Sequence, residues 1–575
     1  MTDILVFAKQ IPNVNRIEFD PVTMRIKREN VELNLNSFDR KAIEEALRIR
    51  EKKGGRVSVA TMGPPSAADI LKEALRMGVD HCYLITDRAY AGADTLVTSR
   101  ILAKFASTVH TDLILMGKYS LDGETSQVPP EVAQLLGIRL RTSVSRIDIG
   151  DDGIVVEVES EEGLAEYREM LPALFSVSEK INKPRAPLKE EMDFEQKITR
   201  LDEKSLAAGV TGADSPTQVM DTVRVESGRN VEFLELNEET FGRIDSILYS
   251  RSENEPQRTI EPYEGESRGE IWGVALGDGD TSVEIASKIS QLSRDGKLRA
   301  SMFGNIKSSE LKGMPCHEYI FIDCRDMKLF AGVLTDLIRE RGPEIVVFPS
   351  TVEGREVSAR IAATLGLGLT ADCVDLEITE GRLIQHKPAF GGGVVARIVS
   401  RTKPQMATVR PGIFRKYASG RSFLESRIDV AGLNQSLPLT WRKRPESFGK
   451  MAGARVVVGL GRGIKDGIRM GEVMDLARML GAAVGGTRPV VDAGLLPRQQ
   501  QIGLTGYSIS PDVYFALGIS GRDNHVVGIR YAKKVVAVNN SRDAPIFRYA
   551  DYGIVSDMFD FISRYRMHLS EARSR

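Results

Sequence analysis

Buried strands that alternate with helices dominate this sequence and limit the folds open to it. Helical spacing of Ala, Ile, Leu and Met marks residues 39–53 and 66–78. Apolar, β-branched runs surround these helices at 4–8, 57–61, 82–86, 113–117 and 171–177. Strands that are apolar on both faces and separated by helices form parallel sheets with helices on both sides. The first part of the chain is therefore predicted to be a doubly wound α/β domain.

The same alternation starts again twice further along the chain. A second series begins at Glu270 with IWGVAL, and a third begins at Arg455 with VVVGLGRGI. Between 182 and 269, proline and charge replace the apolar runs, which is typical of an extended arm and a linker. A chain of 575 residues also exceeds the roughly 250–300 residues of a single core. We expect α/β domains over 1–220, 268–450 and 451–575, with a linker over 221–267.

Two segments suggest that the first two domains are homologous. Residues 113–137 read LILMGKYSLDGETSQVPPEVAQLLG, and residues 345–366 read IVVFPSTVEGREVSARIAATLG. Each is an apolar strand, a turn, an acidic residue followed by glycine, and a helix of small residues ending in Leu-Gly. A general likeness of all strand–helix units is the alternative. We favour two homologous domains packed as a pseudo-dimer.

Charge and cysteine content exclude several classes of protein. The net charge is −1, so no global basic field is available to hold nucleic acid or an anionic membrane. The four cysteines are scattered without a Cys-x-x-Cys pair and the six histidines are dispersed, so we expect neither a metal site nor a disulfide framework. No run approaches the ~18 apolar residues of a membrane span, and the first residues resemble a strand rather than a signal sequence. We expect a cytoplasmic protein.

The loop at 118–130 is a candidate anion site. It follows a strand and precedes a helix, and its Gly123, Thr125 and Ser126 could hold a phosphate through backbone N–H groups and the helix dipole. In an open parallel sheet the ligand crevice lies at the carboxyl ends of the strands, where Ala8 and Asn36 also fall. A capped helix start explains the same residues nearly as well.

Polar loops also follow the strands of the third domain. Arg462 ends the glycine turn of VVVGLGRGI, and the later loops read GGTRPVVDAG, QQQIGLTGYSISPD, LGISGRDNH and VVAVNN. Four such loops on one sheet edge suit a large polar ligand with a diphosphate and two ring systems. Arg488 can bring charge to it, Thr505 a hydroxyl, and His525 a further charge if protonated. A core histidine is an equally open interpretation of His525.

In order along the chain, these segments resemble the electron transfer flavoprotein family. Residues 1 to about 220 resemble its beta subunit in AKQIP, MGPP, LDGETSQVPPEVA and LPALFSVSEKINKPRAP. The later part resembles its alpha subunit in PQMATVRPGIF, TRPVVDAG, QIGLTGY, ALGISG and ADYGIVSD. The resemblance implies two homologous doubly wound domains as a base, with a C-terminal α/β domain that binds FAD.

The resemblance also assigns FAD contacts. They fall on Arg462, Thr487, Arg488, Gln501, Leu504, Thr505, Gly506, Ser520, Gly521, Asn524, His525, Asn539 and Asp557. Thr505 would address flavin N5, a protonated His525 would offset negative charge on the reduced ring, and Arg488 would raise its potential. Asn539 and Asp557 would serve the adenosine end. Leu504 replaces the family's glutamine, Thr487 its serine, and Asn524 a glutamine, which affects redox tuning more than binding.

In the beta-like part, the resemblance implies a second nucleotide site. It falls on Ala8, Asn36, Asp122, Gly123, Glu124, Thr125, Ser126, Gln127 and Val128. Simple members hold AMP there, and electron-bifurcating members hold a second FAD. The Asp-Gly-Glu-Thr-x-Gln loop resembles the bifurcating version, whereas Asn13-Val14 replaces the Asp-Thr of that group, and we expect AMP. Leu188, in an arm near 182–200, falls on the family's partner-recognition loop; a leucine that packs on a strand is the alternative.

The expected function is that of a redox carrier rather than of an enzyme with its own substrate. Its FAD would relay electrons from acyl-CoA or related flavin dehydrogenases, as in fatty acid β-oxidation, to a membrane ETF-quinone oxidoreductase. The first alternative is an NADH-dependent bifurcating flavoprotein with a second FAD. The other is an adenine-nucleotide-binding protein without redox activity.

Overall fold

The computed structural model describes most of the chain. The described residues are 2–12, 32–150, 153–160, 163–189, 193–224, 229–249, 259–389, 394–430, 435–443, 451, 453–465, 467–503 and 506–574. Four positions on which the sequence analysis depends, Asn13, Val14, Leu504 and Thr505, lie outside these residues.

The first half is built on a parallel sheet with β1 (Ile4–Phe7) at its centre. The parallel strands around it are β4 (Val57–Met62), β5 (His81–Ile85), β6 (Leu113–Gly117), β10 (Ala173–Val177), β7 (Arg139–Ile149) and β11 (Ile198–Leu201). Helices α1 (Ser37–Lys53) and α2 (Ala68–Met77) cover one face. Helices α3 (Thr95–Ala106) and α4 (Val128–Leu136) cover the other. The predicted doubly wound fold is confirmed.

The second half repeats this plan around β14 (Glu270–Ala275). Its other parallel strands are β15 (Arg299–Gly304), β16 (Glu318–Ile322), β17 (Ile345–Pro349), β18 (Leu369–Cys373), β22 (Gln405–Val409) and β23 (Leu424–Ile428). Helix α7 (Gly279–Gly296) covers one face, and α8 (Met327–Arg341) and α9 (Val352–Leu365) cover the other. The strand order β23-β16-β15-β14-β17-β22-β18 matches β11-β5-β4-β1-β6-β10-β7, so the two halves are homologous.

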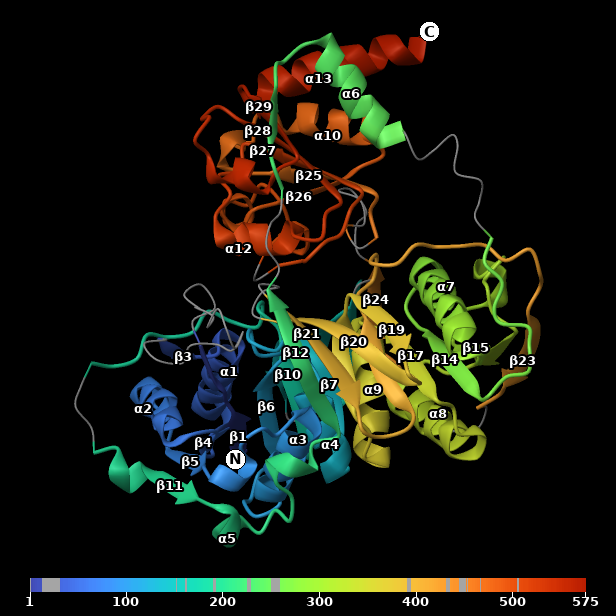
Figure 1. Ribbon diagram of the computed structural model, residues 1–575. Coiled ribbons are helices and arrows are strands. Elements are labelled where there is room, and N and C mark those ends of the chain that lie inside the picture. The colour runs from blue at the N-terminus through green and yellow to red at the C-terminus, as the bar shows by residue number, and fades with distance from the viewer. Residues whose placement is uncertain are drawn as a thin grey trace.

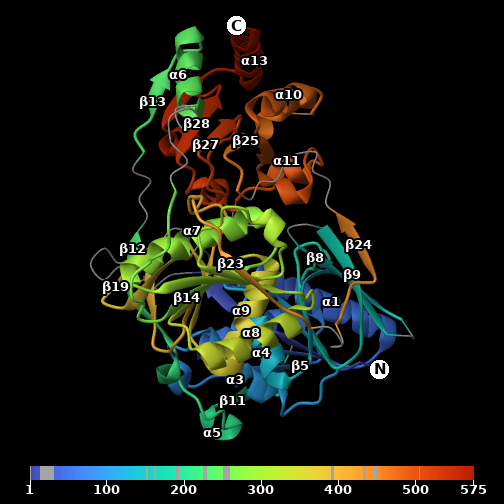
Figure 2. The ribbon, with the colours of Figure 1, turned by 90° about the vertical axis from the view of Figure 1, so that its right-hand side faces the viewer.

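The halves exchange one strand each. Antiparallel strands β8 (Ile154–Glu159) and β9 (Gly163–Glu169) extend the first sheet, and β24 (Thr440–Lys443) of the second half pairs with β9. Conversely, β12 (Thr217–Arg224) of the first half pairs with β21 (Val394–Ser400), beside β20 (Arg382–Ala389) and β19 (Asp375–Thr379). Figure 1 shows β12 beside β21, and Figure 2 shows β24 beside β9. The exchange makes the halves a pseudo-dimer within one chain.

The third domain lies on top of this base (Figure 1). Its parallel sheet contains β25 (Val456–Leu460), β26 (Ala483–Gly486), β27 (Val513–Leu517), β28 (Lys534–Asn539) and β29 (Tyr552–Val555). Its helices are α10 (Met470–Leu480), α11 (Arg488–Asp492), α12 (Asp523–Val526) and α13 (Met558–Ser574).

The expected linker over 221–267 is wrong for part of that segment. Strand β13 (Glu232–Leu234) pairs in parallel with β29, and α6 (Glu238–Tyr249) lies beside α13. Phe241, Ile244 and Leu248 are buried in the core of the third domain. The spacing of these three apolar residues fits one face of a helix. Charged residues surround them in the sequence, which is why the segment was interpreted as a linker. The third domain therefore contains a strand and a helix from the segment between the first and second halves.

Two negative findings hold for the residues that the structure describes. No helix among them is long and apolar enough to cross a membrane. No group of three or more histidine, cysteine, aspartate or glutamate side chains there is placed to hold a metal ion.

A charged cluster fastens α6 to α13. His568 on α13 contacts Glu238 through Nδ1 at 2.6 Å and Asp245 through Nε2 at 2.9 Å, and the Tyr565 hydroxyl donates to Asp245 at 2.6 Å. Burial alone would lower the pKa of His568, but its hydrogen bonds to Glu238 and Asp245 raise that pKa above the ordinary value. The protonated imidazole donates to both carboxylates, so protonation favours the docked helix.

We predict that His568→Gln removes a pH-dependent part of the third domain's stability. The folded-state pKa of His568 lies above its unfolded value of about 6.5. The contribution, about 1–2 kcal/mol, is therefore fully present below that pH and is lost as the pH rises through the folded-state pKa. Thermal unfolding between pH 5.5 and 9 measures it. His110→Gln, which removes an exposed histidine of the first half, is the control. An equal pH dependence in wild type and His568→Gln would contradict the prediction.

Candidate nucleotide and flavin sites

The carboxyl edge of the third sheet collects most of the expected FAD contacts. Parallel strands end at one edge, so the residues after them are neighbours. Arg462 follows β25, Thr487 and Arg488 follow β26, Ser520 and Gly521 follow β27, Asn539 ends β28, and Asp557 follows β29. Gln501 lies beside the end of β26 through a bridge to Gly486.

Glycines bring the loops after β25 and β27 into contact. A Cβ on Gly461 would lie 2.0 Å from the carbonyl oxygen of Gly518, and one on Gly521, whose φ is +86°, would lie 2.1 Å from the nitrogen of Ile546. The chain moves outward from β25 in one direction to β26 and in the other to β27, so this is the topological switch point of the sheet. Such crevices bind dinucleotides, and the residues present fit FAD.

The side chains at this edge fall into two groups. Arg462, Ser520 and Asn524 are exposed, and so is Arg488, which contacts Asp492 at 3.2 Å. In contrast, the Asn539 amide donates to Ile519 and accepts from Ser541, and Asp557 accepts from the Phe559 amide, each at 2.8–2.9 Å. Asn539 and Asp557 therefore shape their own turns, while the exposed group faces solvent and can reach a ligand.

His525 does not fit its expected charge state. Its ring is buried, with Nδ1 at 3.1 Å from the Ile502 carbonyl oxygen and Nε2 at 3.0 Å from the Tyr514 hydroxyl. Burial lowers its pKa to about 4. A neutral ring that donates from Nδ1 and accepts at Nε2 satisfies both partners. Burial therefore favours the neutral ring and the interpretation of His525 as a core histidine over a protonated imidazole beside the flavin.

The first half contains a cavity of about 470 Å³ at the carboxyl ends of its strands. The expected residues that line it are Ala8, Gly123, Thr125, Ser126, Gln127 and Val128. Its other walls include apolar side chains such as Phe7, Met62 and Met116, and Lys387 from the second half. Six of the residues expected at the nucleotide site thus line a cavity to which both halves contribute.

Three of the expected nucleotide-site residues have other places among the described residues. The Asn36 amide donates to the Tyr119 carbonyl oxygen at 3.0 Å, Asp122 pairs with Lys9 at 2.6 Å, and Glu124 lines a different cavity. They hold the loop in shape rather than form the cavity wall. Pro129 and Pro130 are the second and third residues of helix α4. Prolines lack N–H groups, so these two positions do not provide the donors expected to hold phosphate.

Asp39 is a cavity residue that the site prediction missed. Its carboxylate accepts backbone N–H groups from Lys9 at 2.8 Å and Gly117 at 3.1 Å, which fixes the ends of β1 and β6 beside the cavity. Burial raises its pKa to about 7, against the opposing effect of these hydrogen bonds. The sequence did contain a signal for Asp39: it lies in the first turn of the first long helix, three residues after the expected site residue Asn36.

A second cavity, of about 280 Å³, lies between the third domain and both halves of the base. The third domain contributes Arg498, Gly503, Gly506 and Tyr507, among others. The base contributes charged residues that include Lys118, Glu124, Glu179, Arg355 and Arg410. Tyr119 and Ser126 line both cavities, so the two spaces adjoin.

The chain thus has two homologous doubly wound halves and a third domain with a dinucleotide-type crevice at its switch point. This architecture is that of an α/β nucleotide-binding protein with an added dinucleotide-binding domain. The electron transfer flavoprotein domain matches residues 23–205 and again 269–429. The electron transfer flavoprotein FAD-binding domain matches residues 450–530. The chain belongs to the electron transfer flavoprotein family, with a beta-like half followed by an alpha-like part.

Curated relatives divide in the same way. The electron transfer flavoprotein subunit beta of Thermoanaerobacterium thermosaccharolyticum is 43% identical over 185 residues, which are 32% of this chain and 71% of that subunit. The subunit alpha of the same organism is 39% identical over 243 residues, 40% of this chain and 73% of that subunit. The acryloyl-CoA reductase electron transfer subunit beta of Anaerotignum propionicum is 32% identical over 328 residues, 49% of this chain and 89% of that protein.

We predict that His525 stays neutral from pH 5.5 to 8 in the flavin-containing protein. Its pKa near 4 places the charged form below this range. Nitrogen NMR of histidine-labelled protein, with His525→Gln to assign the resonance, should show the Nδ1–H tautomer throughout. A shift of both ring nitrogens to imidazolium values within the range would contradict the assignment.

Proposed function

We propose that this protein carries single electrons from acyl-CoA or related flavin dehydrogenases to a membrane quinone oxidoreductase. The observation that carries the proposal is the dinucleotide crevice of the third domain, combined with a separate nucleotide cavity in the beta-like half. Bound FAD supplies the reversible one-electron chemistry. The chain's own residues bind that cofactor, set the electrostatic field around its flavin ring and present it to partners.

The roles of the crevice residues follow from their exposure and charge. Arg488 begins α11 with its guanidinium at the surface and can place positive charge beside the flavin ring. Arg462 and Ser520 follow β25 and β27, where the diphosphate of a dinucleotide lies in sheets of this kind. His525 and Tyr514 fill the space behind the crevice and contribute no charge there.

We assign AMP to the cavity of the beta-like half, as a structural ligand. Its apolar walls suit an adenine ring, and Thr125 and Ser126, which line the cavity, suit a phosphate. AMP in this position would join the two halves, because Leu369, Thr370 and Lys387 of the alpha-like part line the same cavity.

Partner recognition is assigned to the arm that contains Leu188. This side chain is 57% exposed. The backbone N–H of Leu188 donates to the Arg76 carbonyl oxygen at 2.9 Å, which holds the arm against α2. An exposed apolar side chain on a fixed backbone suits an anchor for a dehydrogenase surface.

A second FAD in the beta-like cavity is the other candidate, with hydride from NADH as the electron source. One observation favours it: the two cavities share Tyr119 and Ser126, so a redox group in the first would lie next to the space beneath the third domain. A relative named as an electron transfer subunit of acryloyl-CoA reductase is also compatible with a reductase as partner.

Cofactor content separates the two candidates. Acid release from purified protein should give one FAD and one AMP per chain. Met62→Trp, which places a large side chain in the cavity wall, should reduce AMP by about tenfold or more, which corresponds to about 1.4 kcal/mol, and leave FAD unchanged. Met170→Trp, at an exposed position away from the cavity, is the matched control. Two FAD per chain, reduced to one by Met62→Trp, would contradict the AMP assignment and favour bifurcation.

A further inference from the structure

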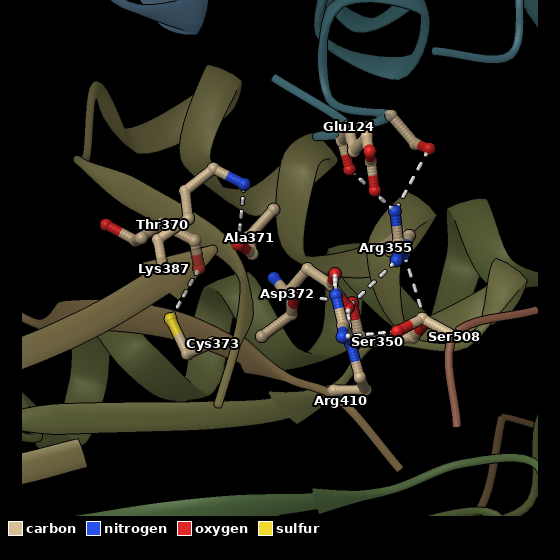
Figure 3. A network of polar contacts seen from close by, with 12 residues as sticks. Glu124, Ser350, Arg355, Thr370, Ala371, Asp372, Cys373, Lys387, Arg410 and Ser508 are labelled. Carbon is tan, nitrogen blue, oxygen red and sulfur yellow. Dashed lines mark hydrogen bonds and ion pairs between the residues drawn. The ribbon is translucent and has the colours of Figure 1, made fainter. Parts of the chain in front are cut away.

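A network of polar contacts, buried at Asp372 and Arg410, lies between the loop at 123–128 and the third domain (Figure 3). Arg355, on α9, donates through Nη1 to the Glu124 carbonyl oxygen at 3.0 Å and to the Ser126 hydroxyl at 3.2 Å. Its Nη2 donates to Asp372 at 3.2 Å. Arg410 donates to the same carboxylate at 2.5 Å and to the Ser508 hydroxyl of the third domain at 2.9 Å. An unbroken series of hydrogen bonds therefore connects the loop at 123–128 to Ser508.

The position of Asp372 depends on a bulge at the end of β18. Asp372 has a φ of +61°, the register with β22 shifts there, and its N–H donates to the Thr408 hydroxyl at 2.9 Å. The first half has the same bulge: Ser143 has a φ of +55°, and its N–H donates to the Ser176 hydroxyl at 3.2 Å. Both homologous halves therefore have the same backbone bulge at this position, although the side chains there differ.

The two halves differ in the side chains that the repeat presents. The Arg410 N–H donates to the Cys373 carbonyl oxygen, and the Ser178 N–H donates to that of Val144, so these two positions correspond. The first half thus has Ser143 and Ser178 where the second has Asp372 and Arg410. Since the serines support the same backbone, the fold does not require the buried ion pair. The pair lies on the side where Ser508 of the third domain docks.

Backbone conformation at the other end of the network supports a functional role. Glu124 has a φ of +50° and Ser126 a φ of +55°, and both are the acceptors of Arg355. Non-glycine residues in this region are strained and persist only where surrounding contacts hold them. Arg355 contacts both strained residues, so it helps to hold the loop at 123–128 in this conformation.

The third domain meets the same strand end through a second contact. The Ser510 hydroxyl donates to the Gly412 carbonyl oxygen at 2.8 Å, two residues beyond Arg410. Arg410 also lies over the Tyr531 ring, 5.3 Å from its centroid. The segment 508–510 therefore docks around Arg410, which is itself buried beside Asp372.

We propose that Arg355, Asp372 and Arg410 are positioning residues that couple the nucleotide loop at 123–128 to the docked position of the third domain through Ser508. In its nucleotide-dependent form this inference rests on the proposed function, because it takes the first cavity to hold an adenine nucleotide. Nucleotide binding orders the loop, the loop fixes Arg355, and the shared carboxylate fixes Arg410 beneath the third domain. Coupling between two sites is reciprocal, so loosening either end loosens the other.

Hydrogen exchange of the flavin-containing full-length protein tests the coupling without added nucleotide. Arg355→Lys cuts the network at the loop and should raise exchange in peptide 506–512 by about fivefold or more. Ser508→Ala cuts it at the third domain and should raise exchange in peptide 123–128. Asp372→Asn should raise exchange at both ends. Arg360→Lys is the matched control, since Arg360 is a buried arginine of the same helix that contacts Glu356 and Gln134 instead.

Exchange of the central strand at 270–276 serves as the readout of general destabilisation. The coupling is overturned if each variant loosens only its own end, or if the distant end changes no more than in Arg360→Lys or than 270–276 does.

Adding AMP to nucleotide-depleted protein separates this inference from the proposed function. In wild type, AMP should protect both 123–128 and 506–512, and in Asp372→Asn only 123–128. Protection of 123–128 alone in wild type would overturn the coupling and leave the AMP site intact. Absence of protection at 123–128 would count against the AMP site, and the reciprocal effects of the variants would then decide the coupling.

Discussion

The exchange of one edge strand between the two halves is the contact on which the rest of the structure depends. Strand β12 of the first half completes the small sheet of the second, and β24 of the second half extends the sheet of the first. Each exchange satisfies a free strand edge and fixes one half against the other. The cavity that both halves line and the platform for the third domain exist only in that arrangement.

The third domain breaks the symmetry of this base. The repeat provides two equivalent bulges, but only the second places a carboxylate and a guanidinium, Asp372 and Arg410, beneath the third domain. Two opposing effects act on Asp372: burial raises its pKa, and Arg410 and Arg355 lower it to about 2. The carboxylate therefore remains charged, and a buried charge of this kind is tolerated only with its partners. Only the second half is thus specialised to dock the third domain at this bulge.

Sequence patterns predicted the architecture well because buried parallel strands are local signals. Ala8 and the 123–128 loop were found because they follow strand ends. Arg462 and Arg488 of the crevice were found for the same reason, whereas most of the other crevice residues came from the family resemblance. The patterns failed where a role depends on partners far along the chain. Gln127 lines the cavity and Asn36 does not, and long-range hydrogen bonds engage both side chains. Neither the network around Asp372 nor the burial of His525 has a local signature, and the short, charged α6 was taken for linker.

We infer that this chain is a joined pair of subunits whose flavin domain needs both. Strand β13 and helix α6 precede the alpha-like part yet lie in the core of the third domain. The direct test divides the chain after residue 254 and expresses the pieces 1–254 and 255–575 separately and together. We predict that 255–575 alone does not retain FAD, and that the co-expressed pieces purify as a 1:1 complex with one FAD. Stoichiometric FAD in 255–575 alone would contradict it.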